Sequence, residues 1–259
     1  EDPKQESVLY VGTDNSVYVS VDGGDHWTKI NGNLPPAPVY WITIQEHFDD
    51  MVIGTYGRGI YILDDISPFR EMANSNQNEV SFMPIHDAYR FQQIQSMKND
   101  GTSLIRGQNP SYGANIDFFL PDTNNQEVTI SIQDLSGNEI RKITPRKITA
   151  GVNRIMWDLR YERTKTPKLR VNPYDVDWVT YNEDGWRPLR TWDIDVNSGK
   201  LGPKAIPGNY QAVLNIDGKK YSRTFQVLKD PNTAGSLKDI KAQFKYLMKL
   251  RSVINNNVD

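Results

Sequence analysis

The chain has 259 residues, of which 37% are hydrophobic and 24% are charged, as in a folded globular protein rather than a disordered one. Its formal net charge of -2 gives no overall field that would favour nucleic acid or an anionic membrane as a partner. The absence of cysteine excludes disulfides, thiol nucleophiles and cysteine-based zinc sites. No apolar run approaches the length of a membrane span, and we expect no cofactor.

A short stretch near the N-terminus has the Asp-box pattern Ser/Thr-x-Asp-x-Gly-x-x-Trp, with Ser20, Asp22, Gly24 and Trp27 at its four fixed positions. The pattern predicts a tight hairpin, because glycine adopts positive φ angles without strain and the Asp and Ser oxygens bond to N–H groups of the turn. Trp27 then begins the return strand and can lay its ring on the sheet. We interpret the box as a structural turn rather than a catalytic site.

The first 70 residues contain an internal repeat. The Gly-Thr pairs that begin at Gly12 and Gly54 lie 42 residues apart, and the Val-Tyr-Val and Ile-Tyr-Ile runs centred on Tyr18 and Tyr61 lie 43 apart. Several short strands in a unit of this length are typical of a β-propeller blade. A propeller needs ~4–8 blades. The sequence therefore predicts that residues 1–70 form the last blades of a propeller, and that the upstream blades, before residue 1, are their partners.

The Asp box and the run at 54–68, Gly-Thr-Tyr-Gly-Arg-Gly-Ile-Tyr-Ile-Leu-Asp-Asp-Ile-Ser-Pro, together resemble the end of a known family. This is the sortilin-like, bacterial neuraminidase repeat family of large exported propeller proteins, many of them labelled as glycosyl hydrolases. The resemblance covers about a quarter of the chain. It implies an extracytoplasmic location (secreted, periplasmic or at the cell surface). In such families the Asp box usually lies away from the active site.

Sialidases of a similar repeat type use an arginine cluster, a tyrosine and carboxylates. By that resemblance Arg58, Tyr56, Asp64 and Asp65 are the compact catalytic candidates. Asp64 and Asp65 could form a paired acid and base. We favour the alternative that they end a strand in a turn, with one carboxylate in solvent. The three histidines do not have metal-ligand spacing, so we expect no metal site.

Residues 71–232 predict an Ig-like or fibronectin-like β-sandwich. Residues 71–79 are rich in Asn, Gln and Ser and indicate a linker. About seven short strands with frequent turns follow, and a hairpin closes across Asp217-Gly218.

The run from Val128 to Tyr210 resembles the Ig-like accessory domain of flagellar hook-capping proteins and of many bacterial secreted enzymes. We therefore expect Trp157 to anchor the core between the sheets, and the hydroxyl of Tyr210 to tie a corner. Asp158 and Arg160 lie on one face of a strand and predict an ion pair.

Residues 161–206 interrupt this sandwich with a long insertion rich in aromatic residues. The candidate binding residues are Tyr174, Trp178, Tyr181, Trp186 and Trp192. Long loops inside a domain are often functional, so the rings could form a platform for sugar rings or a peptide. We favour the alternative that they dock the insertion onto its own domain or onto the propeller.

Residues 233–259 predict a C-terminal helix. Ser236 can cap it, and Asp239 in the first turn favours its positive end. Apolar residues recur at helical spacing, and the lysines indicate a solvated face. We expect the helix to be cut short and its apolar face to pack on the sandwich or on another copy.

The sequence thus predicts a mainly β protein with three possible functions. The favoured one is a non-catalytic C-terminal fragment of an exported propeller protein, with structural and glycan- or protein-binding roles. The second is part of a glycoside hydrolase whose catalytic site lies mostly in upstream blades. The third is a sortilin-like peptide receptor or secretion component.

Overall fold

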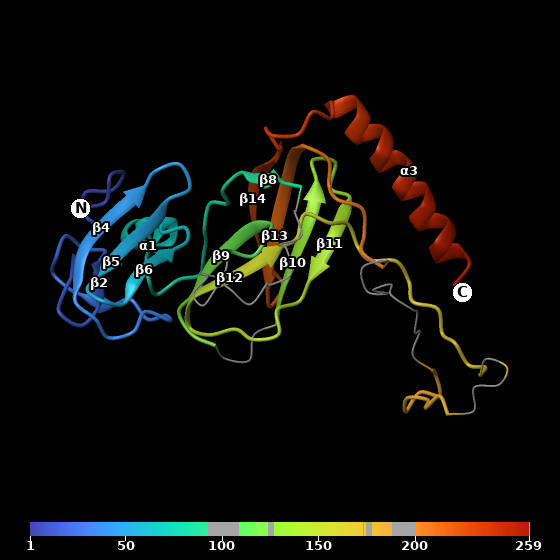
Figure 1. Ribbon diagram of the computed structural model, residues 1–259, viewed down its shortest axis with the longest axis horizontal. Helices are drawn as coiled ribbons and strands as arrows, with labels where there is room; N and C mark the ends of the chain where they lie inside the picture. Colours follow the sequence, from blue (N-terminus) through green and yellow to red (C-terminus); the bar gives the residue numbers. More distant parts are fainter. Residues whose placement is uncertain (93–108, 124–126, 173, 175–177, 188–199, 259) are drawn as a thin grey trace.

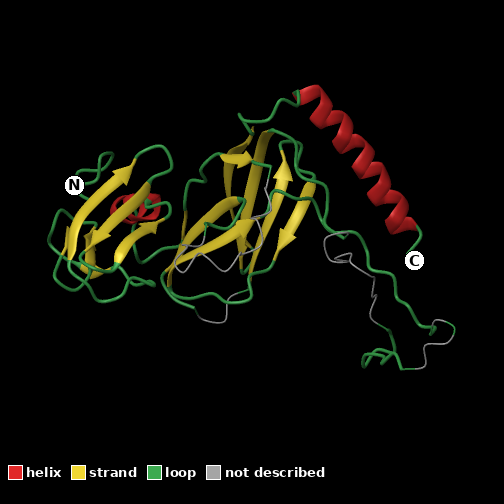
Figure 2. Ribbon diagram, in the orientation of Figure 1, coloured by secondary structure: helices red, strands yellow, loops and turns green. Residues whose placement is uncertain are grey.

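The computed structural model describes the whole chain except residues 93–108, 124–126, 173, 175–177, 188–199 and 259. The protein is mainly β, with several small antiparallel sheets, a curled larger sheet and a C-terminal helix (Figures 1 and 2). The predictions of a mainly β chain and of a C-terminal helix are therefore confirmed.

The N-terminal part holds two three-stranded antiparallel sheets. The first contains β1 (Leu9–Gly12), β2 (Val17–Ser20) and β3 (Thr28–Lys29), in that order. The second contains β4 (Val39–Gln45), β5 (Asp50–Thr55) and β6 (Gly59–Leu63). Strands β1 and β2 hold the first copy of the sequence repeat, and β5 and β6 hold the second.

One apolar core lies between these two sheets. Val17 comes from the first sheet and Val39, Met51 and Ile53 from the second, and all four are buried. The sheets approach so closely that a Cβ atom at Gly12 would lie 2.7 Å from Cγ1 of Val39. Glycine is required there by packing, since any side chain would force the sheets apart.

Helix α1 (Ser67–Asn74) follows β6, where the sequence predicted first the end of a blade and then a linker. The linker prediction is wrong for residues 71–74. Pro68 lies in the first turn of the helix, where its missing N–H costs no hydrogen bond. Ile66 and Phe69 pack against the core of the N-terminal sheets, so burial stabilises a helix that the polar composition did not reveal.

The second part is built from two sheets. The larger has the order β11-β10-β13-β14-β8 and the smaller the order β12-β9-β7. Neighbouring strands are antiparallel, except that β8 runs parallel to β14. The strands are β7 (Ser81–Phe82), β8 (Ala88–Arg90), β9 (Ala114–Leu120), β10 (Val128–Asp134), β11 (Glu139–Ile143), β12 (Gly151–Trp157), β13 (Gly208–Ile216) and β14 (Lys219–Lys229).

Aromatic residues fill the core between these two sheets. Trp157 is fully buried and lies 5.5 Å from the ring of Tyr210 and 5.9 Å from that of Phe225. Its indole N–H donates to the carbonyl of Arg160 at 2.9 Å. The hydroxyl of Tyr210 donates to the carbonyl of Ile206 at 2.7 Å. Both sequence predictions, the core anchor and the tied corner, are confirmed.

The predicted ion pair between Asp158 and Arg160 is wrong. Leu159 between them has a φ of 55°, which turns the chain out of the strand. The guanidinium of Arg160 consequently donates an N–H to the backbone carbonyl of Gly202 at 3.0 Å. Only its backbone N–H reaches the Asp158 carboxylate.

At the base of the insertion, residues 160–164 lie beside residues 200–204. Tyr161 donates its backbone N–H to Pro203, and Thr164 donates to Lys200. Further out, Tyr174 is 94% exposed and Trp178 is 72% exposed. Neither ring is therefore buried against the body of this chain, while docking onto upstream propeller blades stays a prediction.

Helix α3 (Leu237–Asn256) begins with the predicted cap. The Ser236 hydroxyl accepts the N–H of Asp239, and the Asp239 carboxylate accepts the N–H of Ser236. The helix packs on the base of the insertion, where Phe244 lies 5.0 Å from the ring of Tyr161. Among the helices that the structure describes, none has the length and apolar character needed to cross a bilayer.

We predict that Trp157→Ala lowers the free energy of unfolding by about 3–5 kcal/mol, because it opens a cavity and removes a buried hydrogen bond. Urea denaturation measures the change. Trp178→Ala is the control, and its exposed ring predicts a change within about 0.5 kcal/mol. Equal losses in the two variants would contradict this account of the core.

Candidate functional site

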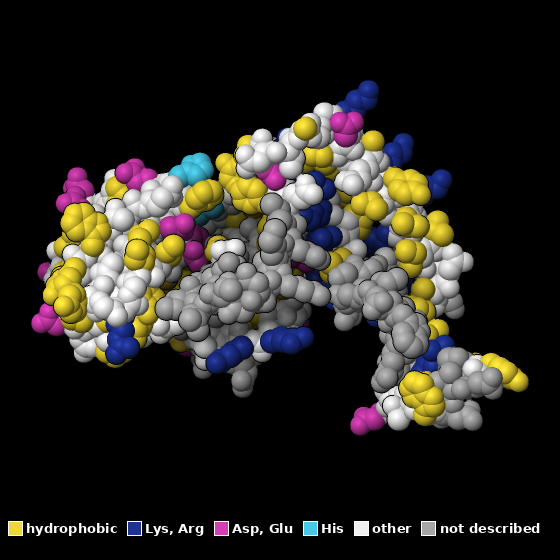
Figure 3. All heavy atoms as spheres, in the orientation of Figure 1, with side chains coloured by type: hydrophobic (Ala, Val, Ile, Leu, Met, Phe, Trp, Pro, Cys, Tyr) yellow, Lys and Arg dark blue, Asp and Glu magenta, His cyan; other side chains and the backbone are white. Residues whose placement is uncertain are grey.

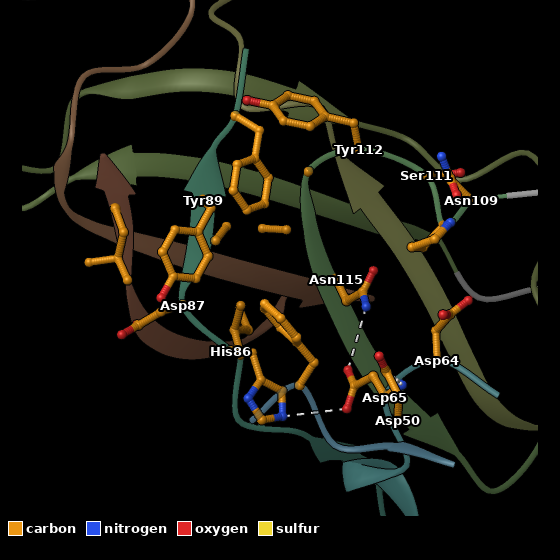
Figure 4. Close-up of a pocket in the computed structure, with 18 of the residues that line it drawn as sticks. Asp50, Asp64, Asp65, His86, Asp87, Tyr89, Asn109, Ser111, Tyr112 and Asn115 are labelled. Atoms are coloured by element: carbon orange, nitrogen blue, oxygen red, sulfur yellow. Dashed lines mark hydrogen bonds and ion pairs between the residues drawn. The ribbon is translucent and has the colours of Figure 1, made fainter. Parts of the chain in front are cut away.

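A cleft of about 1020 Å³ lies where the N-terminal sheets meet the second part (Figure 4). Its lining comes from the turn after β4, the ends of β5 and β6, β8 with its flanks, and the segment that leads into β9. The polar and aromatic residues on which the following paragraphs depend are Asp50, Asp64, Asp65, His86, Asp87, Asn115, Phe48, Tyr89 and Phe91.

A network of charges below the cleft ties the N-terminus to α1 and to the turn before β5. Arg70 bonds to Asp2 at 2.7 Å and to Asp49 at 2.8 Å. Lys4 adds a second cation on Asp49 at 2.8 Å. The side chains of both aspartates are at most 2% exposed, and each needs these partners because an unpaired buried carboxylate is strongly unfavourable.

Arg154 on β12 joins the two parts of the molecule. Its guanidinium pairs with Asp117 on β9 at 2.8 Å and with Asp65 at 3.2 Å. It also donates to the backbone carbonyls of Asp64 and Asp65, at 3.0 and 3.1 Å. One planar side chain thus holds the end of β6 against the second part, which fixes the position of both cleft aspartates.

His86 forms a second bridge between the two parts. Its Nε2 lies 3.4 Å from Asp65 and 3.6 Å from Asp49 (Figure 4 shows the contact with Asp65). The hydrogen bond to Asp65 raises the pKa of the imidazole, and the charges of Asp65 and Asp49 add to this, while burial opposes it. The imidazolium is therefore the form that the site favours.

Asp65 is held as a carboxylate. Burial would raise its pKa, but the contact with His86, the bond from Ser67 and the charge of Arg154 together lower it well below the usual range. The Ser67 hydroxyl donates at 2.6 Å and the Asn115 amide at 3.5 Å. A carboxylate with this many partners serves as a structural anchor rather than as a proton donor.

Asp64 differs from its neighbour. Burial raises the pKa of its carboxyl, and the charge of Asp50 adds to the effect while Arg154 opposes it. The pairing of Met51 with Leu63 brings Asp50 and Asp64 to the same end of the β5–β6 hairpin. Among the residues that the structure describes, the side chains of Asp50 and Asp64 form no ion pair.

Aromatic rings border the other side of the cleft. Phe48 lies 4.5 Å from the ring of His47 and 6.3 Å from that of Tyr89, and Tyr89 stacks on Phe91 at 5.2 Å. Phe48 is 47% exposed and Phe91 is 39% exposed, so these rings present apolar area to a ligand. The cleft therefore combines carboxylates with aromatic surface.

The structure separates the predicted catalytic candidates. Arg58 lies in the exposed turn before β6, whereas Asp64 and Asp65 follow the end of that strand. At ~3.3 Å per residue, the two positions are about 20 Å apart along the strand. Arg58 and Tyr56 are absent from the cleft lining, and Asp65 is the carboxylate of the two that is held in ion pairs, with His86 and Arg154.

The Asp box forms the bonds of a turn. Ser20 donates its hydroxyl to Asp22 at 2.7 Å, and its oxygen accepts the N–H of Gly24 at 2.9 Å. The N–H of His26 donates to Asp22 at 3.0 Å, and the indole of Trp27 donates to the carbonyl of Gly24 at 3.0 Å. All these bonds close within the hairpin, away from the cleft.

The aromatic insertion lies apart from the cleft as well. Lys168 sits 4.3 Å above the ring of Trp186, and the Tyr181 hydroxyl bonds to Asn172. Trp192 lies outside the described residues. None of the candidate binding aromatics that the structure describes lines the cleft.

Sequence reasoning missed the residues that come from other strands. His86, Arg154 and Asn115 are far from Asp64 in the chain and carry no motif. Asp50 could have been identified from the sequence, because pairing the two strands of the β5–β6 hairpin places it beside Asp64. Within the described ranges, no group of three or more His, Cys, Asp or Glu side chains is arranged to hold a metal ion.

Comparisons with protein-family models, with curated proteins and with solved structures find no match to this chain.

We predict that His86 makes stability depend on pH. Since its pKa is raised in the folded protein, its contribution is complete below the unfolded value of ~6.5 and is lost as the pH rises through the folded value. The side chain is 46% exposed, so the loss is only roughly 0.2–1 kcal/mol. Urea denaturation from pH 6 to 9 should show a smaller loss in His86→Gln than in the parent.

His47→Gln is the control for that experiment, because His47 lines the same cleft without pairing with Asp49 or Asp65. Asp65 makes stability depend on pH in the acid range. Because its pKa is lowered in the folded protein, its contribution to stability is present above ~3.9 and is lost as the pH falls through the folded value. A His86→Gln profile identical to that of the parent above pH 6.5 would refute the bridge.

We predict that Arg154→Met lowers the free energy of unfolding by roughly 3–5 kcal/mol, because it leaves Asp117 buried without a cation. Adding Asp117→Leu should recover part of the loss, since the unpaired charge is then removed. Urea denaturation of both variants checks this. A single variant as stable as the parent would show that the pair does not hold the junction.

Proposed function

We propose that the chain is a non-catalytic part of an extracytoplasmic β-propeller protein and serves structural and ligand-binding roles. In this proposal β1–β6 belong to the last blades, and the sheets from β7 to β14 form an Ig-like accessory module. The observation that carries it is the open apolar face of the sheet β4–β6.

That sheet carries apolar side chains on both faces, and the described residues cover only one of them. Cross-strand pairing sets Trp41, Gly54 and Ile60 side by side, and places Val52 beside Ile62. Trp41 is 71% exposed, Ile60 75% and Ile62 60%. Hydrophobic side chains stand at the surface over these sheets in Figure 3. An exposed apolar patch of this kind marks an interaction site.

The kind of partner follows from the covered face. There the sheet β4–β6 packs on β1–β3, which is a copy of the same sequence repeat. Sheets of one repeat that stack in series are the arrangement of solenoids and propellers, where each unit covers the face of the next. A further antiparallel sheet of this repeat therefore fits the open face, as the upstream blades would supply.

The second part supports an Ig-like module. Its two sheets enclose a shared core, with Trp157 buried between them and the Tyr210 hydroxyl bonded to a backbone carbonyl four residues earlier. A buried tryptophan and a tyrosine corner are common in such sandwiches. The parallel contact of β8 with β14 is a departure from an entirely antiparallel pattern.

The chemistry of the cleft favours binding over catalysis. Asp65 is committed to ion pairs, and Arg58 lies at the far end of β6. Ser111 in the described lining is exposed, and no described hydrogen bond joins it to His47 or His86. What remains is a concave surface with convergent polar groups and aromatic rings, which is the usual composition of a ligand site.

A glycoside hydrolase is the second candidate, and the raised pKa of Asp64 beside Asp50 favours it. A carboxyl with a raised pKa can act as a general acid near neutral pH. If the parent protein hydrolyses a glycan, Asp64→Asn should lower kcat at least 100-fold with little effect on KM. Unchanged kcat would remove this candidate.

A sortilin-like peptide receptor or secretion component is the third candidate. Parallel glycan and peptide arrays probed with the purified chain separate it from a glycan-binding module. Retention on glycans alone would contradict the receptor, and retention on peptides alone would contradict the glycan module.

For the open face we predict concentration-dependent self-association of the chain, because a second copy offers the same apolar sheet. Ile60→Lys with Ile62→Lys should abolish it in sedimentation velocity, while the free energy of unfolding changes by less than about 1 kcal/mol. Leu135→Lys, at a 64% exposed position elsewhere, is the control. A parent chain that stays monomeric at high concentration would count against the blade assignment.

A further inference from the structure

The carboxylates at the junction fall into two groups that differ in whether a cation is paired with them. Those facing the interior are each paired with cations: Asp2 and Asp49 with Arg70, and Asp117 and Asp65 with Arg154. Their side chains are at most 9% exposed. This pairing is what burial of a charge demands.

Asp50, Asp64 and Asp87, the other carboxylates of the described lining, form no ion pair with a lysine or an arginine. Asp50 accepts only the backbone N–H of Asp65, at 3.0 Å, among the described contacts. Burial raises the pKa of the Asp64 carboxyl, and the negative charge of Asp50 adds to this while Arg154 opposes it. Asp87 adds a further carboxylate to the lining. No lysine or arginine occurs among the described residues that line the cleft.

The aromatic side of the cleft suits one kind of cation. Phe48, Tyr89 and Phe91 form a continuous series of ring contacts and leave ring surface exposed. In Figure 4, Tyr89 and Asp87 lie on the side of the cleft opposite Asp64. A ligand between them would meet rings along its length and carboxylates at its end. A guanidinium or an ammonium on an aliphatic stem has this distribution of charge and apolar surface.

We propose that the junction cleft binds an arginine or lysine side chain of a basic polypeptide segment. Asp50 and Asp64 take the cationic head through charge-assisted hydrogen bonds, and the rings of Phe48 and Tyr89 cover the stem. This inference rests on the proposed ligand-binding role and narrows it to a cationic peptide. An anionic ligand is disfavoured, because it would meet the same unpaired carboxylates.

The test uses the whole chain and labelled acetyl-Arg-Arg-Arg-amide in fluorescence anisotropy, with acetyl-Gln-Gln-Gln-amide and maltotriose as neutral competitors. We expect saturable binding that weakens with added salt, and no competition from either neutral probe. Asp50→Asn with Asp64→Asn should weaken binding about tenfold or more. The amide oxygen at position 50 can still accept the N–H of Asp65, so the fold is retained.

Two further variants separate the cleft from a general effect of charge. Glu6→Gln with Asp14→Asn removes the same charge from exposed positions outside the cleft and should change affinity less than twofold. Ser111→Lys places a cation in the cleft without touching its carboxylates and should weaken binding, whereas Ser222→Lys on exposed β14 should not.

The proposal is overturned if both charge-removing pairs weaken binding equally, if Ser111→Lys has no effect, or if maltotriose displaces the peptide. Loss of binding in Trp178→Ala would move the site to the insertion and would overturn it too. These readouts do not involve the open face of β4–β6. Self-association through Ile60 and Ile62 therefore reports on the blade assignment whether or not the peptide binds.

Discussion

Burying carboxylates at a junction between two sheet systems is unfavourable unless cations are buried with them. Arg154 satisfies this condition for Asp65 and Asp117. Its guanidinium also donates hydrogen bonds to the backbone carbonyls at the end of β6. Arg70 does the same for the N-terminus and the turn before β5. The position of the N-terminal sheets relative to the second part depends on Arg154, whereas Arg70 holds elements of the N-terminal part together.

The cleft is a consequence of that arrangement. The end of β6 contacts β9 and β12, while the turn after β4 contacts β8, and the cleft lies between these two lines of contact. The paired carboxylates form its rigid base. The unpaired ones face outward together with aromatic rings, and this contrast supports a binding role more strongly than any single residue does.

Part of this site was visible in the sequence. Adjacent Asp64 and Asp65 at the end of a strand attracted attention, but they looked equivalent. The structure distinguishes them, because only Asp65 receives Arg154 and His86 from other strands. The spacing of residues along the sequence does not indicate which distant side chains will become their partners. The polar segment after Pro68 was misread for a similar reason, since its helix is stabilised by packing of Ile66 and Phe69 on distant strands.

The sequence by itself determined the local features: the Asp-box turn, the alternating strands, the Trp157 anchor, the Tyr210 corner and the cap at Ser236. Each rests on interactions between residues close in the chain or on a simple periodicity of apolar residues. Only the tertiary structure decided which strands share a sheet, which carboxylates acquire cations and which apolar face stays open. These depend on contacts between distant segments, which are selected by burial and charge pairing in three dimensions.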